Sequence, residues 1–217
     1  MAEDDPIAAA AFWGGLRVAT ARFSLGEALS HSRTRGGEIL VADQGARLWT
    51  GTVELWQARH DAADAVMARI EALQMAGAAL MVHPLPRPGP IHDPEGVVLG
   101  AATPVIASLA PNARALTLSG LPAGYLLSPG DMLGFPYGTP VKYALHRVVV
   151  GATAGAGGST GLLELVPGIR PGASLGTPVS LVRPAMKALI IPGSVNPGQG
   201  QGIWRRGIAF SFIQTLM

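Results

Sequence analysis

The stretch GDMLGFPYGTPVKYALHRVVVGATAGAGGSTGLLELVPGIRPGASLGTPVSLV, residues 130–182, decides the fold. It consists of short runs of apolar or alternating residues, and glycines and prolines separate each run from the next. Runs of this length between turn residues are typical of strands in β-sandwiches and β-barrels. We expect strands here over residues 132–135, 143–150, 162–166 and 179–182.

Comparable short runs occur on both sides of this stretch. We expect further strands over residues 16–23, 38–42, 47–57, 78–83, 104–109, 113–118, 187–191 and 208–214. A parallel α/β fold would need many more helices than these patterns allow. With 29 glycines and 18 prolines in 217 residues, the sequence predicts a mainly β protein.

One segment, residues 61–76, has a helical period instead. Val66, Ile70 and Leu73 fall on one face of such a helix. Asp61 is suited to cap its first turn, and Gly77 is suited to end its last turn. We therefore expect one amphipathic helix that packs its apolar face on a sheet.

A proline-rich segment divides the chain. Residues 84–94, PLPRPGPIHDP, favour an extended connector, because proline restricts the backbone. The segment that follows contains only predicted strands and turns until a return near residue 184. We predict two β-sandwich or barrel-like domains. Residues 1–94 and 185–217 together form the first, which carries the helix, and residues 95–184 form an inserted second domain.

The two ends of the chain are expected to meet. Residues 208–214 alternate large apolar with smaller side chains, which is the period of a half-buried strand. Burying each of the two phenylalanines and the isoleucine stabilises a fold by roughly 1.5–3 kcal/mol, so such a chain end seldom stays loose. Residues 16–23 form a comparable strand near the other terminus, and we expect both strands in one sheet.

Composition favours an assembly subunit. Charged residues make up only 14% of the chain and hydrophobic residues 48%, whereas about a quarter of a typical domain is charged. Up to Glu95 the chain has 12 acidic and 8 basic residues, and beyond it 2 acidic and 8 basic, so the halves carry −4 and +6. The basic residues are not gathered with aromatic side chains, as nucleic-acid binding requires. We expect contacts between subunits to use this asymmetry.

No targeting or membrane segment is expected. The apolar runs are far shorter than the roughly 20 residues of a membrane-spanning helix. The first residues, MAEDDP, are acidic, whereas a secretory signal begins with basic residues. The absence of cysteine excludes disulfides and thiolate metal sites.

The one serine-hydrolase motif lacks its structural context. Residues 157–161 read GGSTG, which places Ser159 in a literal G-x-S-x-G pattern. A nucleophile elbow needs a strand before the serine, a helix after it and a histidine from a later strand. Here the serine stands among glycines, and no histidine follows His146. We expect a hairpin tip rather than a nucleophile.

The other candidate groups are also isolated. Among the five histidines, only His83 and His92 lie near each other and near a carboxylate, Asp93, across the proline-rich segment. Asp131 follows Ser-Pro-Gly, as a turn residue does, and Glu164 is the only other acid beyond residue 96. The sequence GQGQG at 198–202 lacks the lysine of a phosphate loop. We expect no catalytic, cofactor or metal site, and no enzyme.

Several short motifs follow one another along the chain in an order that is similar to that of a known family. They are MVHP at 81–84, LPAG at 121–124, LSPGDMLG at 127–134, LHRV at 145–148, LVPGIR at 165–170 and GIAFSF at 207–212. With the β-rich start and the helix ending near Gly77, this order resembles distal tail proteins and related tail-tip proteins. These proteins occur in long non-contractile-tailed bacteriophages and in gene-transfer-agent-like particles.

The resemblance implies a structural virion protein at the distal end of the tail. Such proteins form a homo-oligomeric ring, usually a hexamer, which joins the tail tube to the host-recognition apparatus. The implied partners are the tail tube protein, tail hub or tip proteins and receptor-binding proteins. The family has no shared catalytic residues.

A carbohydrate-binding β-sandwich of the tail tip is the alternative. Sugar platforms need exposed aromatic faces. In the inserted domain, Phe135 and Tyr137 flank a proline and are the candidate carbohydrate contacts. Packing of that turn is the other role open to both rings, and the sequence favours it.

Overall fold

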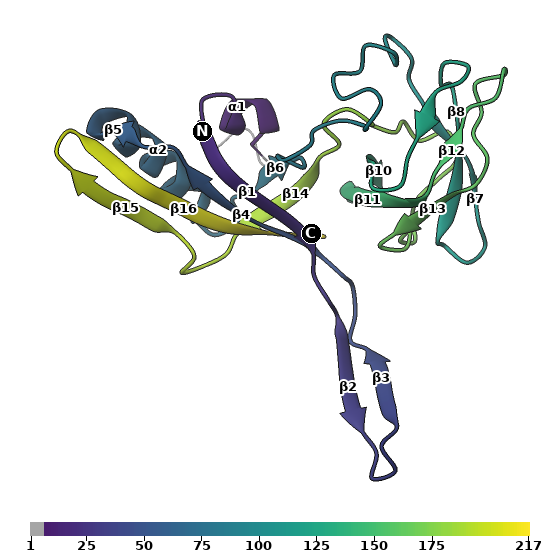
Figure 1. Cartoon of the computed structure of the whole chain (residues 1–217), viewed down its shortest axis with the longest axis horizontal. Helices are drawn as coiled ribbons and strands as arrows, with labels where there is room; N and C mark the ends of the chain where they lie inside the picture. Colours follow the sequence, from purple (N-terminus) through teal and green to yellow (C-terminus); the bar gives the residue numbers. More distant parts are fainter. Residues whose placement is uncertain (1–6) are drawn as a thin grey trace.

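The computed structural model describes residues 7–217 and confirms the mainly β fold class (Figure 1). The larger sheet has seven strands, all antiparallel to their neighbours, in the order β1-β4-β16-β14-β6, and β5 and β15 also pair with β16. Its strands are β1 (Val18–Leu25), β4 (Trp49–Leu55), β5 (Ala58–Arg59), β6 (Leu80–Val82), β14 (Met186–Ile190), β15 (Asn196–Gln201) and β16 (Trp204–Gln214).

A second sheet has five antiparallel strands in the order β10-β11-β13-β8-β7. They are β7 (Val105–Leu109), β8 (Ala115–Ser119), β10 (Met132–Tyr137), β11 (Lys142–Val150) and β13 (Leu163–Val166). Two further sheets have two strands each: β9 (Leu126–Leu127) pairs with β12 (Ala152–Thr153), and β2 (Leu29–Arg33) with β3 (Ile39–Asp43). The predicted strand at 179–182 is wrong, because that segment forms only one isolated bridge, from Ser180 to Gly134.

The expected meeting of the chain ends in one sheet is confirmed. β4 lies between β1 and β16, and the Phe210 and Phe212 side chains of β16 are buried. At Gly51 of β4 the two neighbouring strands come close. A Cβ at this position would lie 2.3 Å from the Phe212 ring and 2.8 Å from the carbonyl oxygen of Arg22. A side chain at position 51 would therefore force the centre of the sheet apart.

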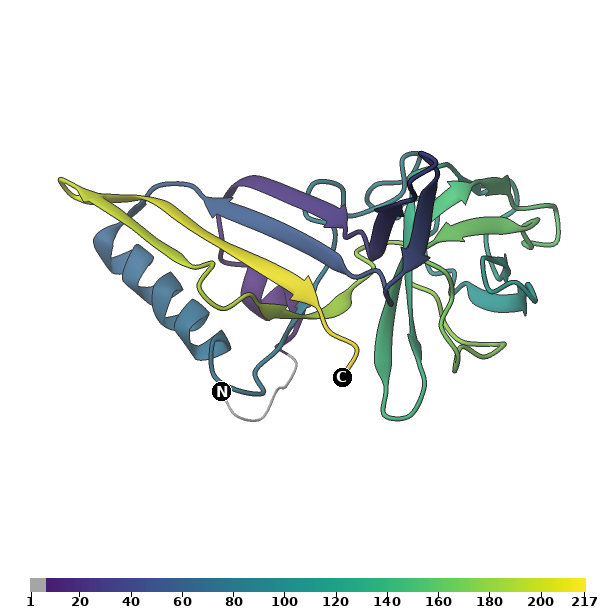
Figure 2. The ribbon, with the colours of Figure 1, turned by 90° about the horizontal axis from the view of Figure 1, so that it is seen from below.

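Helix α2 (His60–Leu73) lies against one face of the seven-stranded sheet (Figure 2). Ile70 and Leu73 are buried as expected, whereas Met67 takes the buried place that the sequence assigned to the half-buried Val66. The predicted range 61–76 is too long at its end. Asp61 provides no cap, because its carboxylate pairs instead with Arg59 at 3.9 Å.

A short helix that the sequence did not predict, α1 (Ala9–Trp13), packs beside α2. Phe12 and Trp13 are both buried, and Trp13 stacks on Phe210 with ring centroids 6.0 Å apart. Arg69 of α2 lies over the Phe12 ring at 5.4 Å and donates to the carbonyl oxygens of Ala11 and Phe12. The two helices thus complete the core of the seven-stranded sheet.

We predict a large effect of Ile70→Asp, because Ile70 on α2 is fully buried in the core of the seven-stranded sheet. An unpaired carboxylate at this position should lower the free energy of unfolding by about 4 kcal/mol. Chemical denaturation followed by circular dichroism measures this. The control is Ala68→Asp on the exposed side of the same helix, which should cost less than about 1 kcal/mol. Equal stability of the two variants would contradict the packing of α2.

The two larger sheets share side-chain contacts. Met132 and Leu145, from β10 and β11, belong to the same apolar cluster as Trp49 of the seven-stranded sheet. The Trp49 indole Nε1 donates to the carbonyl oxygen of Leu145 at 2.7 Å, and Arg147 lies over the Trp49 ring at 5.0 Å. The division into residues 1–94 with 185–217 and residues 95–184 stays a prediction.

Candidate assembly surfaces

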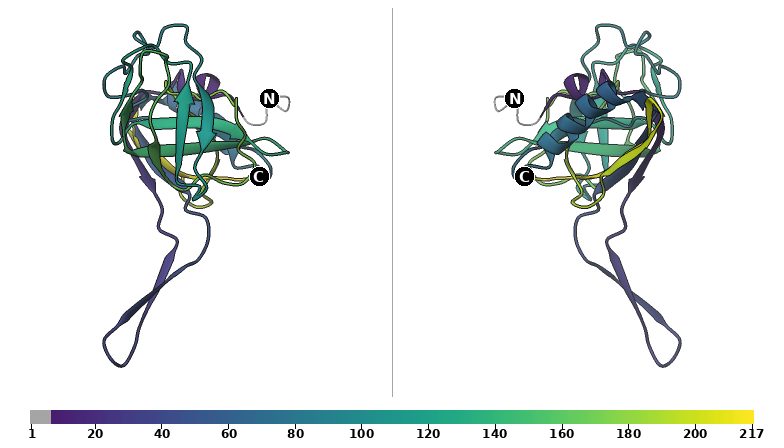
Figure 3. Two further views of the ribbon diagram at one scale, coloured as in Figure 1. Left: turned by 90° about the vertical axis from the view of Figure 1, so that its right-hand side faces the viewer. Right: turned by 90° about the vertical axis from the view of Figure 1, so that its left-hand side faces the viewer.

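The β2–β3 hairpin projects away from the rest of the molecule (Figure 3), and we call residues 28–46 the arm. β2 pairs only with β3 in residues 7–217, and every residue of β3 is exposed. The arm therefore has no core of its own. An isolated two-stranded hairpin is marginally stable in water, so the arm needs further contacts to become rigid.

The arm carries large apolar side chains that are more than half exposed to solvent. Leu29, Ile39, Leu40 and Val41 are between 54% and 64% exposed. In the antiparallel register His31 lies opposite Val41 and Arg33 opposite Ile39, so apolar and basic side chains share one face. Exposed apolar groups concentrated on one projecting element mark an interaction surface.

The base of the arm is held to the body. The amide of Gly26 donates to the carbonyl oxygen of Leu48 at 2.8 Å, and Arg47 Nε donates to the carbonyl oxygen of Gly26 at 3.0 Å. These contacts continue the β1–β4 pairing by one step. The arm thus leaves the sheet from a fixed point.

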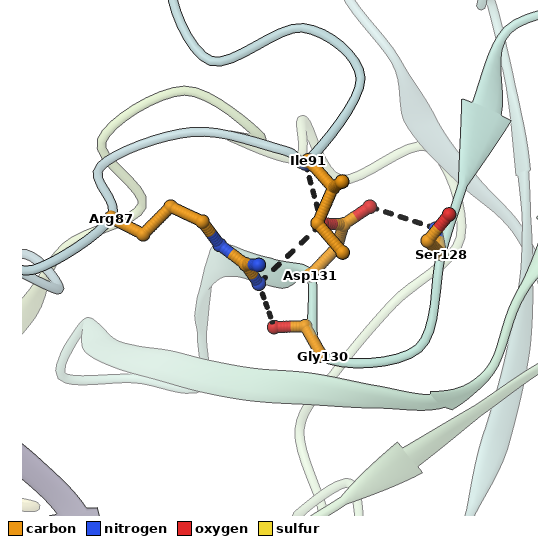
Figure 4. A network of polar contacts seen from close by, with 5 residues as sticks. All are labelled: Arg87, Ile91, Ser128, Gly130 and Asp131. Carbon is orange, nitrogen blue, oxygen red and sulfur yellow. Dashed lines mark hydrogen bonds and ion pairs between the residues drawn. The ribbon is translucent and has the colours of Figure 1, made fainter.

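Asp131 joins the connector 84–94 to the five-stranded sheet (Figure 4). Its carboxylate is fully buried, and it accepts the amides of Ile91 and Ser128 at 2.8 Å each. Arg87 pairs with the same carboxylate at 3.6 Å and donates to the carbonyl oxygen of Gly130 at 2.6 Å. The expected turn role of Asp131 is present in its bond to Ser128, and the contacts to the connector add a second role.

A second buried carboxylate, Asp93, fixes the end of the connector. It accepts the amides of Val98 and Leu99 at 3.0 and 2.9 Å and the hydroxyl of Tyr125 at 3.1 Å. Burial alone would raise the pKa of Asp93, but these hydrogen bonds outweigh it and hold the pKa below its ordinary value. Asp93 is therefore occupied by structural bonds and does not join His83 and His92 in a metal site.

His146 is buried in the core of the five-stranded sheet. Its ring stacks on Phe135 with centroids 5.2 Å apart, and its Nδ1 lies 2.8 Å from the carbonyl oxygen of Pro167. Nδ1 must carry the proton in this contact, which leaves Nε2 as a buried acceptor without a hydrogen-bond partner. Burial, aided by the charge of Arg170, lowers the pKa of His146 to about 4.

This pKa predicts a loss of stability in acid. Unfolded chains protonate histidine near pH 6.5, whereas the folded protein protonates His146 only near pH 4, so stability falls as the pH drops between these values. The loss should reach about 3 kcal/mol. Urea unfolding at pH 7 and at pH 4 measures it, and His146→Gln should remove most of the difference. An unchanged pH dependence in that variant would contradict a neutral buried His146.

The candidate carbohydrate contacts are not exposed. Phe135 and Tyr137 are only 3% and 7% exposed and belong to the core of the five-stranded sheet. A sugar ring cannot stack on an aromatic face that protein atoms already cover. The two rings pack the core from within β10, so the turn that the sequence predicted around Pro136 is wrong, because Pro136 pairs with Tyr143 of β11.

Ser159 lies in an exposed turn, which the amide of Gly155 closes by donating to the Ser159 carbonyl oxygen at 2.9 Å. The turn is not the expected hairpin tip, because its flanking strands β12 and β13 belong to different sheets. The sequence GQGQG at 198–202, for which no strand was predicted, lies mostly in β15. His60 closes this region, with Nε2 2.9 Å from the carbonyl oxygen of Gly202.

Residues 7–217 contain no group of three or more histidine, aspartate or glutamate side chains that could hold a metal ion. None of the helices in this described range is long and apolar enough to cross a membrane. Neither a protein-family model nor a curated protein matches the chain.

Proposed function

We propose that this protein is the structural subunit of a homo-oligomeric ring, of six copies, at the distal end of a long non-contractile tail. The ring connects the tail tube to the host-recognition apparatus of a bacteriophage or a gene-transfer-agent-like particle. The observation that carries the proposal is the arm, whose apolar side chains find no partner within residues 7–217. A neighbouring subunit supplies the missing contacts.

The body of the molecule supports the same role. The seven-stranded sheet and its two helices have a dense aromatic core, formed by Phe12, Trp13, Trp49, Phe210 and Phe212. This core gives the arm a rigid support, so that a contact made by the arm fixes the position of the whole subunit. The low share of charged residues, 14%, suits a protein that hides much of its surface in an assembly.

The side chains that could have taken part in catalysis do not form a common site, and this also favours a structural role over an enzymatic one. The carboxylates of Asp131 and Asp93 accept hydrogen bonds from backbone amides. His146 is buried, and its ring is bonded to the carbonyl oxygen of Pro167. Ser159 lies on an exposed turn between strands of two sheets. Nucleophilic catalysis needs a base beside the nucleophile, and a serine in such a turn is poorly placed to meet one.

Electron microscopy of the purified full-length protein tests the proposal. Closed rings with a central channel are expected, and class averages give the copy number. Mass photometry over a range of concentrations provides an independent measure. A protein that stays a monodisperse monomer at high concentration would overturn the assignment.

Assembly should weaken as salt rises, because the two halves of the chain carry −4 and +6. Salt screens the attraction between charges on neighbouring subunits. At physiological ionic strength the attraction is largely lost beyond about 8–10 Å, and this distance shortens as the salt concentration rises. Mass photometry at 50 mM and 500 mM salt measures the change in oligomer fraction. Assembly that does not depend on salt would leave apolar contacts, such as those of the arm, as the whole driving force.

A further inference from the structure

Two of the four tryptophans lie on the surface, at one end of the seven-stranded sheet. Trp56 follows β4 and Trp204 begins β16, and their side chains are 59% and 38% exposed. Trp13 and Trp49, by contrast, are buried in the core. Indoles at a protein surface are typical of sites where one apolar face meets a partner. The exposed pair therefore marks a binding surface.

Both exposed indoles belong to the face of the sheet opposite α2, which we call the open face. Arg205 points to the helix side, because it pairs with Asp64 of α2 at 2.8 Å. Side chains alternate along a strand, so the neighbouring Trp204 points to the open face. Trp56 follows the buried Leu55 and points away from the core for the same reason. Figure 2 shows α2 on only one side of these strands.

A polar hollow of about 650 Å³ lies on the open face. Glu54 and Arg206, each the neighbour of a residue that points to the helix side, both line it. Three of the lining residues are glycines and contribute no side chain, and the other five are polar. The full lining is Glu54, Asn196, Gly198, Gln199, Gly200, Gln201, Arg206 and Gly207.

The strand register places this hollow beside both tryptophans. Gln201 of the lining pairs with Trp204 across β15 and β16. Ala209 pairs with Glu54 and Arg205 with Ala58 in one register, which puts Gly207 opposite Trp56. Trp204 and Gly207 are three residues apart, or about 10 Å along the strand. The two indoles thus flank the hollow at the span of a short oligosaccharide.

The side chains in the hollow are available to a ligand. Within residues 7–217, Gln199, Gln201 and Arg206 have no hydrogen-bond or ion-pair partner. An amide both donates and accepts, and a guanidinium has five N–H donors. Glu54 accepts the Thr20 hydroxyl at 3.3 Å and has further lone pairs to offer. The charges of Glu54 and Arg206 cancel, so the hollow suits an uncharged ligand.

This combination matches the chemistry of a sugar. A pyranose has an apolar C–H face that stacks on an indole, and its hydroxyl groups both donate and accept hydrogen bonds. A protein partner would instead favour an apolar centre in which charged residues are depleted, and this hollow has no aliphatic lining. We propose that the open face beside Trp56 and Trp204 binds a neutral oligosaccharide.

The sugar site is separate from the features discussed above. Its aromatic rings come from the seven-stranded sheet, whereas the expected carbohydrate contacts Phe135 and Tyr137 are buried in the five-stranded sheet. It shares no residue with the arm, residues 28–46. Sugar binding therefore does not depend on the proposed ring.

A glycan array with the full-length protein tests the proposal. The probes are neutral di-, tri- and tetrasaccharides of glucose, galactose, mannose and N-acetylglucosamine. We expect at least one of them to bind, and isothermal titration calorimetry with the strongest binder gives its dissociation constant. Binding to none of these probes, or only to acidic glycans on the same array, would overturn the proposal.

Substitutions test whether the two indoles form the site. Trp56→Ala and Trp204→Ala should each raise the dissociation constant at least about tenfold, because each removes a stacking face. Trp56→Phe and Trp204→Phe retain a ring and should lose less. The control is Leu175→Ala, which changes a side chain that is 63% exposed outside the site. Binding that survives both alanine changes would overturn the proposal.

NMR of the unaltered protein gives a readout that does not depend on how the variants fold. With ¹⁵N-labelled tryptophan, the strongest binder should shift the indole N–H signals of Trp56 and Trp204 and leave those of the buried Trp13 and Trp49 in place. Shifts confined to the buried pair would contradict the site. Rings that bind no sugar would refute the sugar site alone, and a sugar-binding monomer would refute the ring alone.

Discussion

A protein in which Asn-Gly replaces residues 28–46 should remain folded but form no rings. The deletion removes the arm and joins Glu27 to Arg47 through a two-residue turn. In the register of β1 with β4, Leu25 lies opposite Trp49, so Glu27 and Arg47 are the next positions suited to such a turn. The arm adds nothing to the core, and the free energy of unfolding should change by less than about 1 kcal/mol.

Point variants test whether the apolar side chains of the arm cause the expected loss of ring formation. Burying a leucine or valine at an interface contributes roughly 1.5–3 kcal/mol. Leu40→Asn with Val41→Asn should therefore raise the dissociation constant between subunits at least about a hundredfold. The matched control is Val97→Asn with Val98→Asn, which changes two exposed valines outside the arm.

Mass photometry and electron microscopy measure both outcomes. Normal rings from the protein without the arm would reduce the arm to an accessory element. Equal loss of assembly in the control pair would show that general surface polarity, rather than the arm, decides association.

Asp131→Ala should destabilise the protein by about 3–5 kcal/mol. The change takes away a fully buried carboxylate, which leaves the partly buried amides of Ile91 and Ser128 without their acceptor and Arg87 without its partner. The two amides account for most of the loss, because each polar group left without a partner costs about 1–3 kcal/mol, whereas the partly exposed Arg87 side chain can turn to water. Urea unfolding measures the loss.

Amide hydrogen exchange shows which hydrogen bonds the Asp131→Ala protein loses. The amides of Ile91 and Ser128 should exchange much faster in the Asp131→Ala protein, since both donate to the missing carboxylate. Glu164→Ala is the control, because this exposed carboxylate lies in the same sheet and should change stability by less than about 0.5 kcal/mol. Unchanged exchange at Ile91 would mean that Asp131 does not hold the connector.

Much of the fold was predictable because most strands carry their own apolar pattern. β16 is an example, since its alternating phenylalanines predict both a strand and its burial. β15 was missed because NPGQGQ has no apolar residue, and this segment is a strand only through its pairing with β16. β2, with the sequence LSHSR, was also missed. It has no apolar face that would predict a strand, because nothing in residues 7–217 covers it.

The candidate surfaces were less accessible to sequence reasoning. The charge difference between the halves was visible, but its location depends on which arginines the fold brings together. Arg47, Arg114 and Arg170, for example, line one cleft although they are more than fifty positions apart and belong to three different segments. Asp131 could be recognised as a turn residue from its neighbours, whereas its contacts with Arg87 and Ile91 depend on how the connector runs back across the sheet.

The position of β16 determines when a growing chain can complete its seven-stranded sheet. This strand lies between β4 and β14, yet it follows all the other strands of residues 7–217 in the chain and so leaves the ribosome after them. Until then β4 has an open edge and Gly51 faces no Phe212, while the strands at 105–166 are already complete. A chain cut short before residue 204 exposes its arm without a rigid body behind it. The seven-stranded sheet can therefore close only after β16 has been made, and in the proposed ring this order would keep chains that lack β16 out of assembly.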